Sequence, residues 1–257
     1  MKNKIVIYTC RTGNYDNLMQ PMVVDNSFDY ICFTDNLKKH QQGIWIFREI
    51  PKTINDNQKL SRYPKMFPHI LLSEYEYSVY IDANILIQNQ SFYDYIKDAI
   101  NNNYDLAGIK HPFRKCVYDE FFIVFYTLKE INLRKLKDEY LYLKANGFPR
   151  NYGMYEANII FRKHCAKNVI RQCEEWWSLY LEFTRRDQLS YPYTLWKNGL
   201  SFIYLMPTCG IYAGSHEAYK VNLHSTHLTT IKKILYLLFS LIPQQFVKKL
   251  FYYYLSH

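Results

Sequence analysis

The chain has 257 residues, of which 49% are hydrophobic, and it contains 26 tyrosines and 16 phenylalanines. This length is enough for one large folded domain, and the composition excludes an intrinsically disordered protein. The net charge of +9 favours an anionic partner, which is a nucleic acid, a phosphate-bearing substrate or an anionic membrane. Because the chain has no RGG, RNP-like or helix-turn-helix signal, we expect no nucleic-acid partner.

Targeting and redox signals favour the cytoplasm. The first stretch, MKNKIVIYTC, has a short apolar run and no small-residue cleavage pattern, so it predicts a first strand rather than a signal peptide. No stretch contains the roughly 18–20 apolar residues that a membrane-spanning helix needs. The six cysteines have neither a CxxC pair nor zinc-like spacing, and we expect all of them to be buried free thiols in a reducing compartment.

Short apolar runs separated by polar connections predict the strands of a sheet. Since these runs are uninterrupted, the strands are expected to be covered on both faces, which is typical of a mostly parallel α/β sheet flanked by helices. The expected strands are residues 4–10, 29–35, 44–50, 78–87, 105–112, 156–163 and 202–207.

Helical periodicity fills most of the connections between these strands. In the first helical stretch Pro64 and Pro68 exclude one continuous helix, and we expect a bend near Tyr63. The expected helical stretches are residues 56–75, 91–103, 117–147 (in two segments), 164–183 and 185–199.

The composition changes at about residue 222, which predicts a domain at residues 1–221 and a C-terminal amphipathic tail at residues 222–257. The tail mixes Leu, Phe and Tyr with charges of one sign, all of them lysines. A basic, aromatic segment of this kind favours peripheral contact with the inner face of the cell membrane. The alternative is a pair of helices packed on the domain.

The stretch SVYIDANILI (78–87) contains two oxygen-bearing side chains inside an apolar run. Strand alternation places Asp82 and Asn84 on one face, two residues apart. At the carboxyl end of a parallel strand, side chains enter the crevice where α/β sheets bind ligands. The two oxygens there are suited to share Mg²⁺ or Mn²⁺ with a substrate diphosphate. The alternative is a turn in which both residues have a purely structural role.

Two further groups of charged residues are candidates for binding an anion. Lys59, Arg62 and Lys65 recur every three residues and are suited to contact a diphosphate, although a solvated basic face is an equal alternative. His111 and Arg114, in KHPFRKCVYDE, follow the end of an expected strand, where they are suited to hold a phosphate or acceptor hydroxyls.

Five stretches, in this order and spacing, resemble the DUF616 family, which includes TOD1-like and MUCI70-like plant proteins and bacterial surface-polysaccharide glycosyltransferases. The resemblance covers roughly residues 4–215 and implies a Rossmann-like GT-A fold. It also implies transfer of a sugar from a nucleotide sugar, first of all a UDP-sugar, to a glycan or lipid-linked glycan of a capsule, O-antigen or similar polymer. The stretches are KLSRYPKMFPHILL, YSVYIDANILI, KHPFRKCVYDE, YGMYEANIIFRKH and RRDQLSYPYTLWK.

The resemblance implies where the nucleotide and the metal bind. Thr9, Arg11 and Asp35 follow the first two strands, where GT-A folds hold the base and ribose; the alternative is that they only form turns. In related enzymes a later histidine completes the metal site, and His224 is the candidate, with His227 and His216 near it. The usual second acid of the D-x-D motif is Asn84 here, which weakens the expected metal site.

The resemblance also implies the catalytic residues. Asp187 and Gln188 resemble the D-Q element that lies at the donor sugar, although Asp187 at a helix start is also suited to be only an N-cap. Glu156 lies on an expected strand where contacts with the donor sugar or acceptor are expected. The second functional hypothesis is a catalytically degenerate GT-A protein that only binds a glycan or nucleotide.

Overall fold

The structure is a computed structural model that describes residues 4–13, 17–51, 54–208, 216–222 and 242–256. In this part of the chain a sheet of eight strands forms the centre of the molecule, and a separate pair of strands lies beside it. The strands are β1 (Ile5–Arg11), β2 (Asp29–Thr34), β3 (Gln41–Gln42), β4 (Trp45–Glu49), β5 (Tyr77–Ile81), β6 (Ile85–Ile87), β7 (Leu106–Lys110), β8 (Tyr155–Arg162), β9 (Ile203–Tyr204) and β10 (Tyr219–Val221).

The strand order of the main sheet is β3-β4-β2-β1-β5-β8-β7-β9. Strands β4, β2, β1 and β5 are parallel, whereas β8 is antiparallel to both of its neighbours, β5 and β7. β1 has β2 on one side and β5 on the other. The strands that follow β1 are added on one side as far as β4, and from β5 onward on the other side, so the strand order reverses between β1 and β5. That reversal is the topological switch point at which open α/β sheets bind ligands. The predicted mostly parallel α/β sheet with flanking helices is therefore confirmed.

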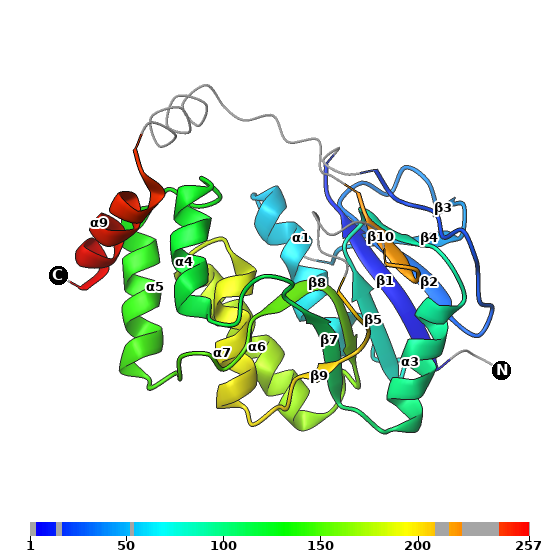
Figure 1. The fold of residues 1–257 in the computed structure, drawn as a ribbon. Helices are drawn as coiled ribbons and strands as arrows, with labels where there is room; N and C mark the ends of the chain where they lie inside the picture. Colours follow the sequence, from blue (N-terminus) through cyan, green and yellow to red (C-terminus); the bar gives the residue numbers. More distant parts are fainter. Residues whose placement is uncertain (1–3, 14–16, 52–53, 209–215, 223–241, 257) are drawn as a thin grey trace.

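Helices cover both faces of this sheet (Figure 1). The first core cluster lies on the α3 side, and the second packs side chains of α1, α6 and α7 against the opposite face. The helices are α1 (Asn57–Met66), α2 (Pro68–Leu71), α3 (Ser91–Asn101), α4 (Val117–Tyr126), α5 (Leu133–Ala145), α6 (Lys167–Glu182), α7 (Asp187–Lys197) and α9 (Gln244–Ser256).

A third core cluster joins α4, α5, α7 and α9, and Figure 1 shows α9 beside α5 on the side away from the sheet. α9 buries Val247, Phe251 and Leu255. The Phe251 ring stacks on Phe125 with centroids 5.0 Å apart, and the Tyr252 hydroxyl donates to Tyr118 O at 2.9 Å. The described end of the tail is therefore a helix packed on the domain, which was the second interpretation of the sequence. None of the helices in the described ranges is long and apolar enough to cross a membrane.

The strand expected at residues 78–87 is two strands in two different sheets. β5 ends at Ile81, the chain turns, and Ile85 N donates to Asp82 O at 2.9 Å. β6 then pairs antiparallel with β10. Because the extended backbone ends at Ile81, the alternation that placed Asp82 and Asn84 on one strand face does not apply. That prediction is wrong.

The bend in the first helical stretch lies later than the predicted position near Tyr63. α1 continues through Pro64 to Met66, and Phe67 N still donates to Tyr63 O at 2.9 Å. The break comes at Pro68, which starts α2 and has no N–H to continue the ladder.

One cysteine contradicts the prediction of buried thiols. Cys165 is exposed because it precedes the start of α6 at Lys167, and Cys209 lies outside the described residues. The buried free cysteines are Cys10, Cys32, Cys116 and Cys173.

Candidate functional site

Asp82 lies directly after β5, at the switch point of the sheet. Its backbone N–H donates to Asn158 O of β8 at 2.9 Å, which fixes where the chain leaves the sheet. One carboxylate oxygen accepts from the Tyr80 hydroxyl at 2.8 Å. Within the described ranges the other oxygen accepts no hydrogen bond, so it is available to a ligand.

Two cations of α1 meet one carboxylate of α7 beside Asp82. Lys65 Nζ lies 2.7 Å and Arg62 Nε 3.1 Å from Oδ2 of Asp187, and the Lys65 side chain is only 3% exposed. Burial by itself would raise the pKa of the Asp187 carboxyl, but the two cations more than offset it and hold the pKa well below its usual value. Arg186, not Asp187, is the N-cap of α7, and the Asp187 side chain makes ion pairs rather than capping bonds.

Aromatic rings and a buried arginine hold Lys65 in place. Its ammonium lies 5.1 Å from the centre of the Tyr80 ring and 5.7 Å from that of Trp176, whose indole N–H donates to Asp187 O at 2.7 Å. The fully buried Arg162 donates to Lys65 O and to the Tyr8 hydroxyl, each at 2.8 Å. The carbonyl end of α1 thus supplies the partial negative charge that faces this guanidinium.

Glu156, at the start of β8, is the second carboxylate near Asp82. Burial raises its pKa to about 7, and the negative charge of Asp82 acts in the same direction. A hydrogen bond from Asn158 at 3.2 Å and the cations Arg114 and Lys129 only partly oppose this shift. Glu156 is therefore poised to exchange a proton near neutral pH.

The loop after β7 carries a third group of charges. Arg114 forms an ion pair with the buried Glu120 of α4, and its guanidinium lies 2.9 Å from Nε2 of His111. Nδ1 of His111 accepts from the backbone N–H groups of Phe113 and Arg114 at 3.1 Å. Burial and the neighbouring Arg114 lower the pKa of His111 to about 4, so the imidazole is neutral at pH 7. The structure brings together His111 and Arg114, which were both predicted to hold an anion or acceptor hydroxyls.

Gln188 links this region to α7. Its amide donates to Tyr155 O at 3.0 Å, next to Glu156 on the chain. The residues predicted as catalytic, Asp187, Gln188 and Glu156, therefore lie at one meeting point of α7 and β8.

The residues predicted to hold the nucleotide are arranged differently from one another. Thr9 is fully buried in β1, and its hydroxyl has no hydrogen-bond partner among the described residues, so burial favours a packing role for this side chain. Arg11, at the end of β1, has its guanidinium 5.6 Å from the centre of the Phe47 ring. Both oxygens of Asp35 accept from Gly13 N, at 3.1 and 2.9 Å, which ties together the loops after β1 and β2.

Lys59 does not join the cations around Asp187. It lies in the first turn of α1, where its backbone N–H donates to the Asp56 side chain at 3.0 Å and its charge acts on the same carboxylate. Of the three evenly spaced cations, only Arg62 and Lys65 meet at the switch point.

The predicted metal ligands are not assembled as expected. The Asn84 amide donates to Asn222 O at 2.6 Å and so joins the turn after β5 to the chain after β10. His224 lies outside the described residues. Among the residues that the structure describes, no group of three or more His, Cys, Asp or Glu side chains is placed to hold a metal ion. Of the predicted set, Asp82 has an oxygen available to a cation.

Sequence reasoning missed Lys129 and Arg186. Lys129 interacts electrostatically with Glu120, Arg114 and Glu156, and Arg186 with Lys129 and Glu120. Lys129 follows Leu128, whose φ of 56° turns the chain back after α4. No local pattern predicts a left-handed leucine, because that conformation is uncommon for non-glycine residues.

The mostly parallel sheet, with a buried ion pair and the Asp82 carboxylate at its switch point, defines a Rossmann-like α/β protein with charged side chains where such sheets bind ligands. The chain belongs to the TOD1/MUCI70 family, because the model of the TOD1/MUCI70 glycosyltransferase-like domain matches residues 1–206. This match confirms the family that the sequence predicted and supports a glycosyltransferase-like role. No curated protein matches the chain.

Proposed function

We propose that the protein transfers a sugar from a nucleotide-sugar donor, first of all a UDP-sugar, to a cell-surface glycan acceptor. The observation that carries this proposal is that Arg62 and Lys65, which form ion pairs with Asp187, also interact electrostatically with Asp82 at the switch point between β1 and β5. A leaving nucleoside diphosphate needs positive charge where its own negative charge develops. The buried Lys65 and the partly buried Arg62 lie on one helix and supply that charge without reorganisation.

The order of the strands supports a position for the donor. Arg11, at the end of β1, and Asp35, after β2, lie on the side proposed to hold the base and ribose. The diphosphate then extends towards Asp82 and the α1 cations. Burial lowers the pKa of Lys65, and Asp187 opposes that shift and pairs with both cations. Its proposed role is to position Arg62 and Lys65 beside the donor sugar.

A divalent ion, Mg²⁺ or Mn²⁺, is part of the proposal. Mg²⁺ is commonly held by one or two carboxylates together with substrate phosphates, and the available oxygen of Asp82 fits that arrangement. When bound, the ion would neutralise charge on the diphosphate. The Asn84 amide nitrogen donates to Asn222 O, which leaves the amide oxygen as the atom that would face the ion, and His224 remains a proposed ligand outside the described residues.

Glu156 is the proposed general base that takes the proton of the acceptor hydroxyl. A base works best when its pKa lies near the operating pH, and burial places that of Glu156 at about 7. Asp187 is unsuited to this role because two cations hold its pKa low.

Calorimetric titration with UDP and with a UDP-sugar, each with and without Mn²⁺, tests the proposal. We expect binding to the wild type and loss of binding and turnover in Asp82→Ala, with an unchanged circular dichroism spectrum. Asp138→Ala, which removes an exposed carboxylate of α5, is the control and should leave binding unchanged. If neither UDP nor the UDP-sugar binds, with or without Mn²⁺, the proposed enzymatic function is refuted.

The second candidate is a degenerate protein of the same fold that binds a nucleotide or glycan without transfer. The neutral Asn84 favours it, because the second acid of a D-x-D site is then missing. This candidate would be identified if the protein binds UDP but neither transfers the sugar of any UDP-sugar nor slowly hydrolyses it.

We also propose that the protein works at the cytoplasmic face of the cell membrane, close to a lipid-linked acceptor. Support comes from the outward face of α9, where Phe246 and Leu250 are each 55% exposed and Tyr253 is 64% exposed. These residues follow an i, i+4, i+7 spacing and so share one face of the helix. Lys249 is exposed on the same helix, which is the composition of a segment that binds an anionic interface.

A further inference from the structure

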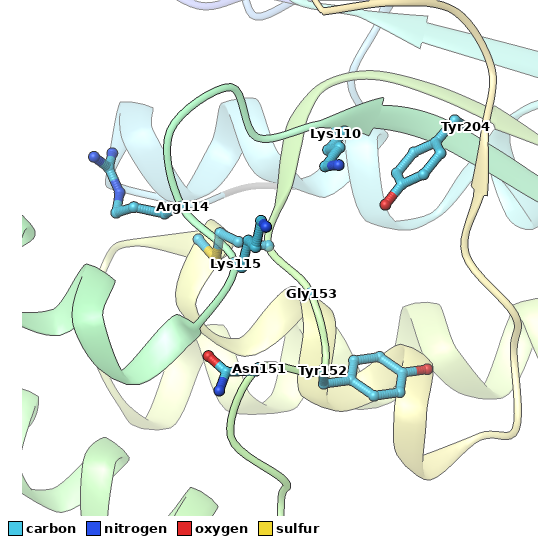
Figure 2. Close-up of a pocket in the computed structure, with 8 residues that line it drawn as sticks. Lys110, Arg114, Lys115, Asn151, Tyr152, Gly153 and Tyr204 are labelled. Atoms are coloured by element: carbon cyan, nitrogen blue, oxygen red, sulfur yellow. The ribbon is translucent and has the colours of Figure 1, made fainter.

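A pocket lies at the end of β7, beside the loop that carries Arg114 (Figure 2). Its volume is about 270 Å³. Pockets for drug-sized ligands are typically about 300–1,000 Å³, so this one suits a single sugar ring rather than an extended chain. The lining residues are Lys110, Arg114, Lys115, Asn151, Tyr152, Gly153, Met154 and Tyr204.

The charge that faces this pocket has one sign. Lys110 and Lys115 are exposed and border it, whereas Figure 2 shows the Arg114 side chain extending away from it. The Lys110 ammonium lies 5.4 Å from the centre of the Tyr204 ring. No carboxylate is among the lining residues, so two ammonium groups are left to attract an anion.

Aromatic rings supply the apolar part of the pocket. Tyr204 is half exposed, and Tyr152 comes from the opposite wall in Figure 2. An aromatic face packs against the C–H groups of a sugar ring, while phenol and amide groups accept or donate hydrogen bonds to its hydroxyls. The pocket therefore combines a surface for a ring with charges for an acidic substituent.

The wall formed by the loop before β8 has a fixed shape. Asn151 has φ 59° and Gly153 has φ 135°, both in the region that side chains rarely adopt. A Cβ atom at Gly153 would collide with the Tyr155 side chain, whose ring stacks on Phe202 with centroids 3.4 Å apart. Backbone conformations of this kind persist where surrounding structure enforces them, and they cluster at binding sites.

The pocket lies on the acceptor side of the proposed reaction centre. Arg114 contributes to its lining and at the same time pairs with Glu120 and interacts with Glu156, the proposed base. The nucleotide side, at β1 and β2, lies across the sheet, with β5 and β8 in between. A sugar in the pocket would thus approach Glu156 from the side opposite to the nucleotide.

We propose that this pocket binds an acidic sugar of the acceptor glycan, with its carboxylate or phosphate between Lys110 and Lys115 and its ring against Tyr204. The proposal rests on the proposed glycosyl transfer and adds to it the chemical class of the acceptor. It separates the roles of the cations, since Arg62 and Lys65 serve the donor, and Lys110 and Lys115 the acceptor.

Calorimetric titrations at low ionic strength, with saturating UDP, test this inference. The probes are a hyaluronan tetrasaccharide that carries glucuronate, its carboxyl-reduced neutral form, and glucose 6-phosphate. We expect at least one acidic probe to bind about tenfold or more tightly than the neutral one, and which of them does so identifies carboxylate or phosphate as the acidic group. Lys110→Met/Lys115→Met should reduce its affinity to that of the neutral probe.

Lys144→Met is the matched control, because Lys144 is an exposed lysine 5.8 Å from the centre of the Tyr140 ring and is not among the residues that line the pocket. It should leave every affinity unchanged, and the double variant should keep the affinity for UDP. Equal binding of acidic and neutral probes, or acidic binding that survives the double variant, overturns the inference. Failure of UDP to bind would instead refute the proposed function, which keeps the two failures distinct.

Discussion

Glu156 and Asp187 are carboxylates of one crevice whose surroundings shift their pKa values in opposite directions. Burial and the charge of Asp82 raise the pKa of Glu156, whereas two cations lower the pKa of Asp187. Environments that separate the pKa values of neighbouring acids are a common way to assign one of them to proton transfer. The roles proposed for the two residues follow from that separation.

Replacement of Glu156 by Gln should lower turnover by about 10²–10⁴-fold, since general base catalysis contributes a factor of this size. In the wild type, turnover should fall as the pH drops through about 7, because the base is then protonated. The measurement is the pH profile of kcat/KM for both proteins. If the variant keeps wild-type turnover, or if its kcat/KM still falls below about pH 7 as in the wild type, Glu156 is not the base.

Replacement of Asn84 by Asp restores the second acid of a D-x-D motif, yet we expect it to impair the protein. The Asn84 amide donates to Asn222 O at 2.6 Å, and a carboxylate in its place would face that carbonyl oxygen without a proton to donate. Loss of a buried hydrogen bond with one partner left unsatisfied costs about 1–3 kcal/mol. Urea unfolding should show this loss, and Mn²⁺ affinity should not increase. Tighter Mn²⁺ binding at unchanged stability would show that residue 84 is a metal ligand.

At the scale of elements, the loop at residues 184–186 fixes where α7 begins. Thr184 donates to the buried Glu139 of α5 through its hydroxyl at 2.6 Å. Arg185 pairs at 2.7 Å with Asp56, which also caps α1. Two helices thus hold the start of α7, and with it Asp187.

The Glu139 contact should make stability depend on pH. Burial raises the pKa of Glu139 to about 8, so the folded protein keeps a proton that the unfolded chain loses near pH 4.5. The resulting stabilisation is complete below about pH 4.5 and is lost as the pH rises through 8. Glu139→Gln keeps the acceptor for Thr184 without the ionisation. The free energy of unfolding, measured with urea between pH 5 and 9, should therefore decline less steeply with pH in the variant.

Glu156 contributes to that decline in the same direction, because its pKa is raised as well. Glu139→Gln is therefore expected to remove only part of the slope, and the double variant with Glu156→Gln more of it. Identical slopes for wild type and Glu139→Gln would show that Glu139 is not buried in its proton-bound form.

At the scale of the whole molecule, α9 has one face on the domain and one face outward. Phe246→Ser/Leu250→Ser should lower binding to vesicles that contain anionic lipid by about tenfold, since buried apolar area and basic charge both contribute to interfacial binding. Sedimentation with phosphatidylcholine vesicles, with and without phosphatidylserine, measures this binding. Point substitutions are preferable to truncation, which would also expose Phe122 and Phe125, the rings that α9 covers.

Ile70→Ser is the control for that experiment, because Ile70 is as exposed as Phe246 but lies on α2. It should leave vesicle binding unchanged. If the α9 variant and the wild type bind anionic vesicles equally well, the outward face of α9 is not a membrane surface.

The sequence by itself determined the elements and the family. Apolar runs such as residues 4–10 and 29–35 predicted β1 and β2, because a strand that is covered on both faces has to be apolar along its length. Helical periodicity likewise predicted α6, and the motif KHPFRKCVYDE grouped His111 and Arg114 in one short segment, where the structure finds them in contact. These features depend on residues that are close together in the chain.

Only the tertiary structure decided how distant segments meet. It showed that Asp187 pairs with Lys65, 122 positions earlier in the chain, and that α9 packs on the domain. It also showed that the backbone turns after Ile81, so Asp82 faces the crevice cations while Asn84 serves the turn. The physical reason is that an ion pair or a turn depends on groups brought together by folding, and local periodicity contains no information about such partners.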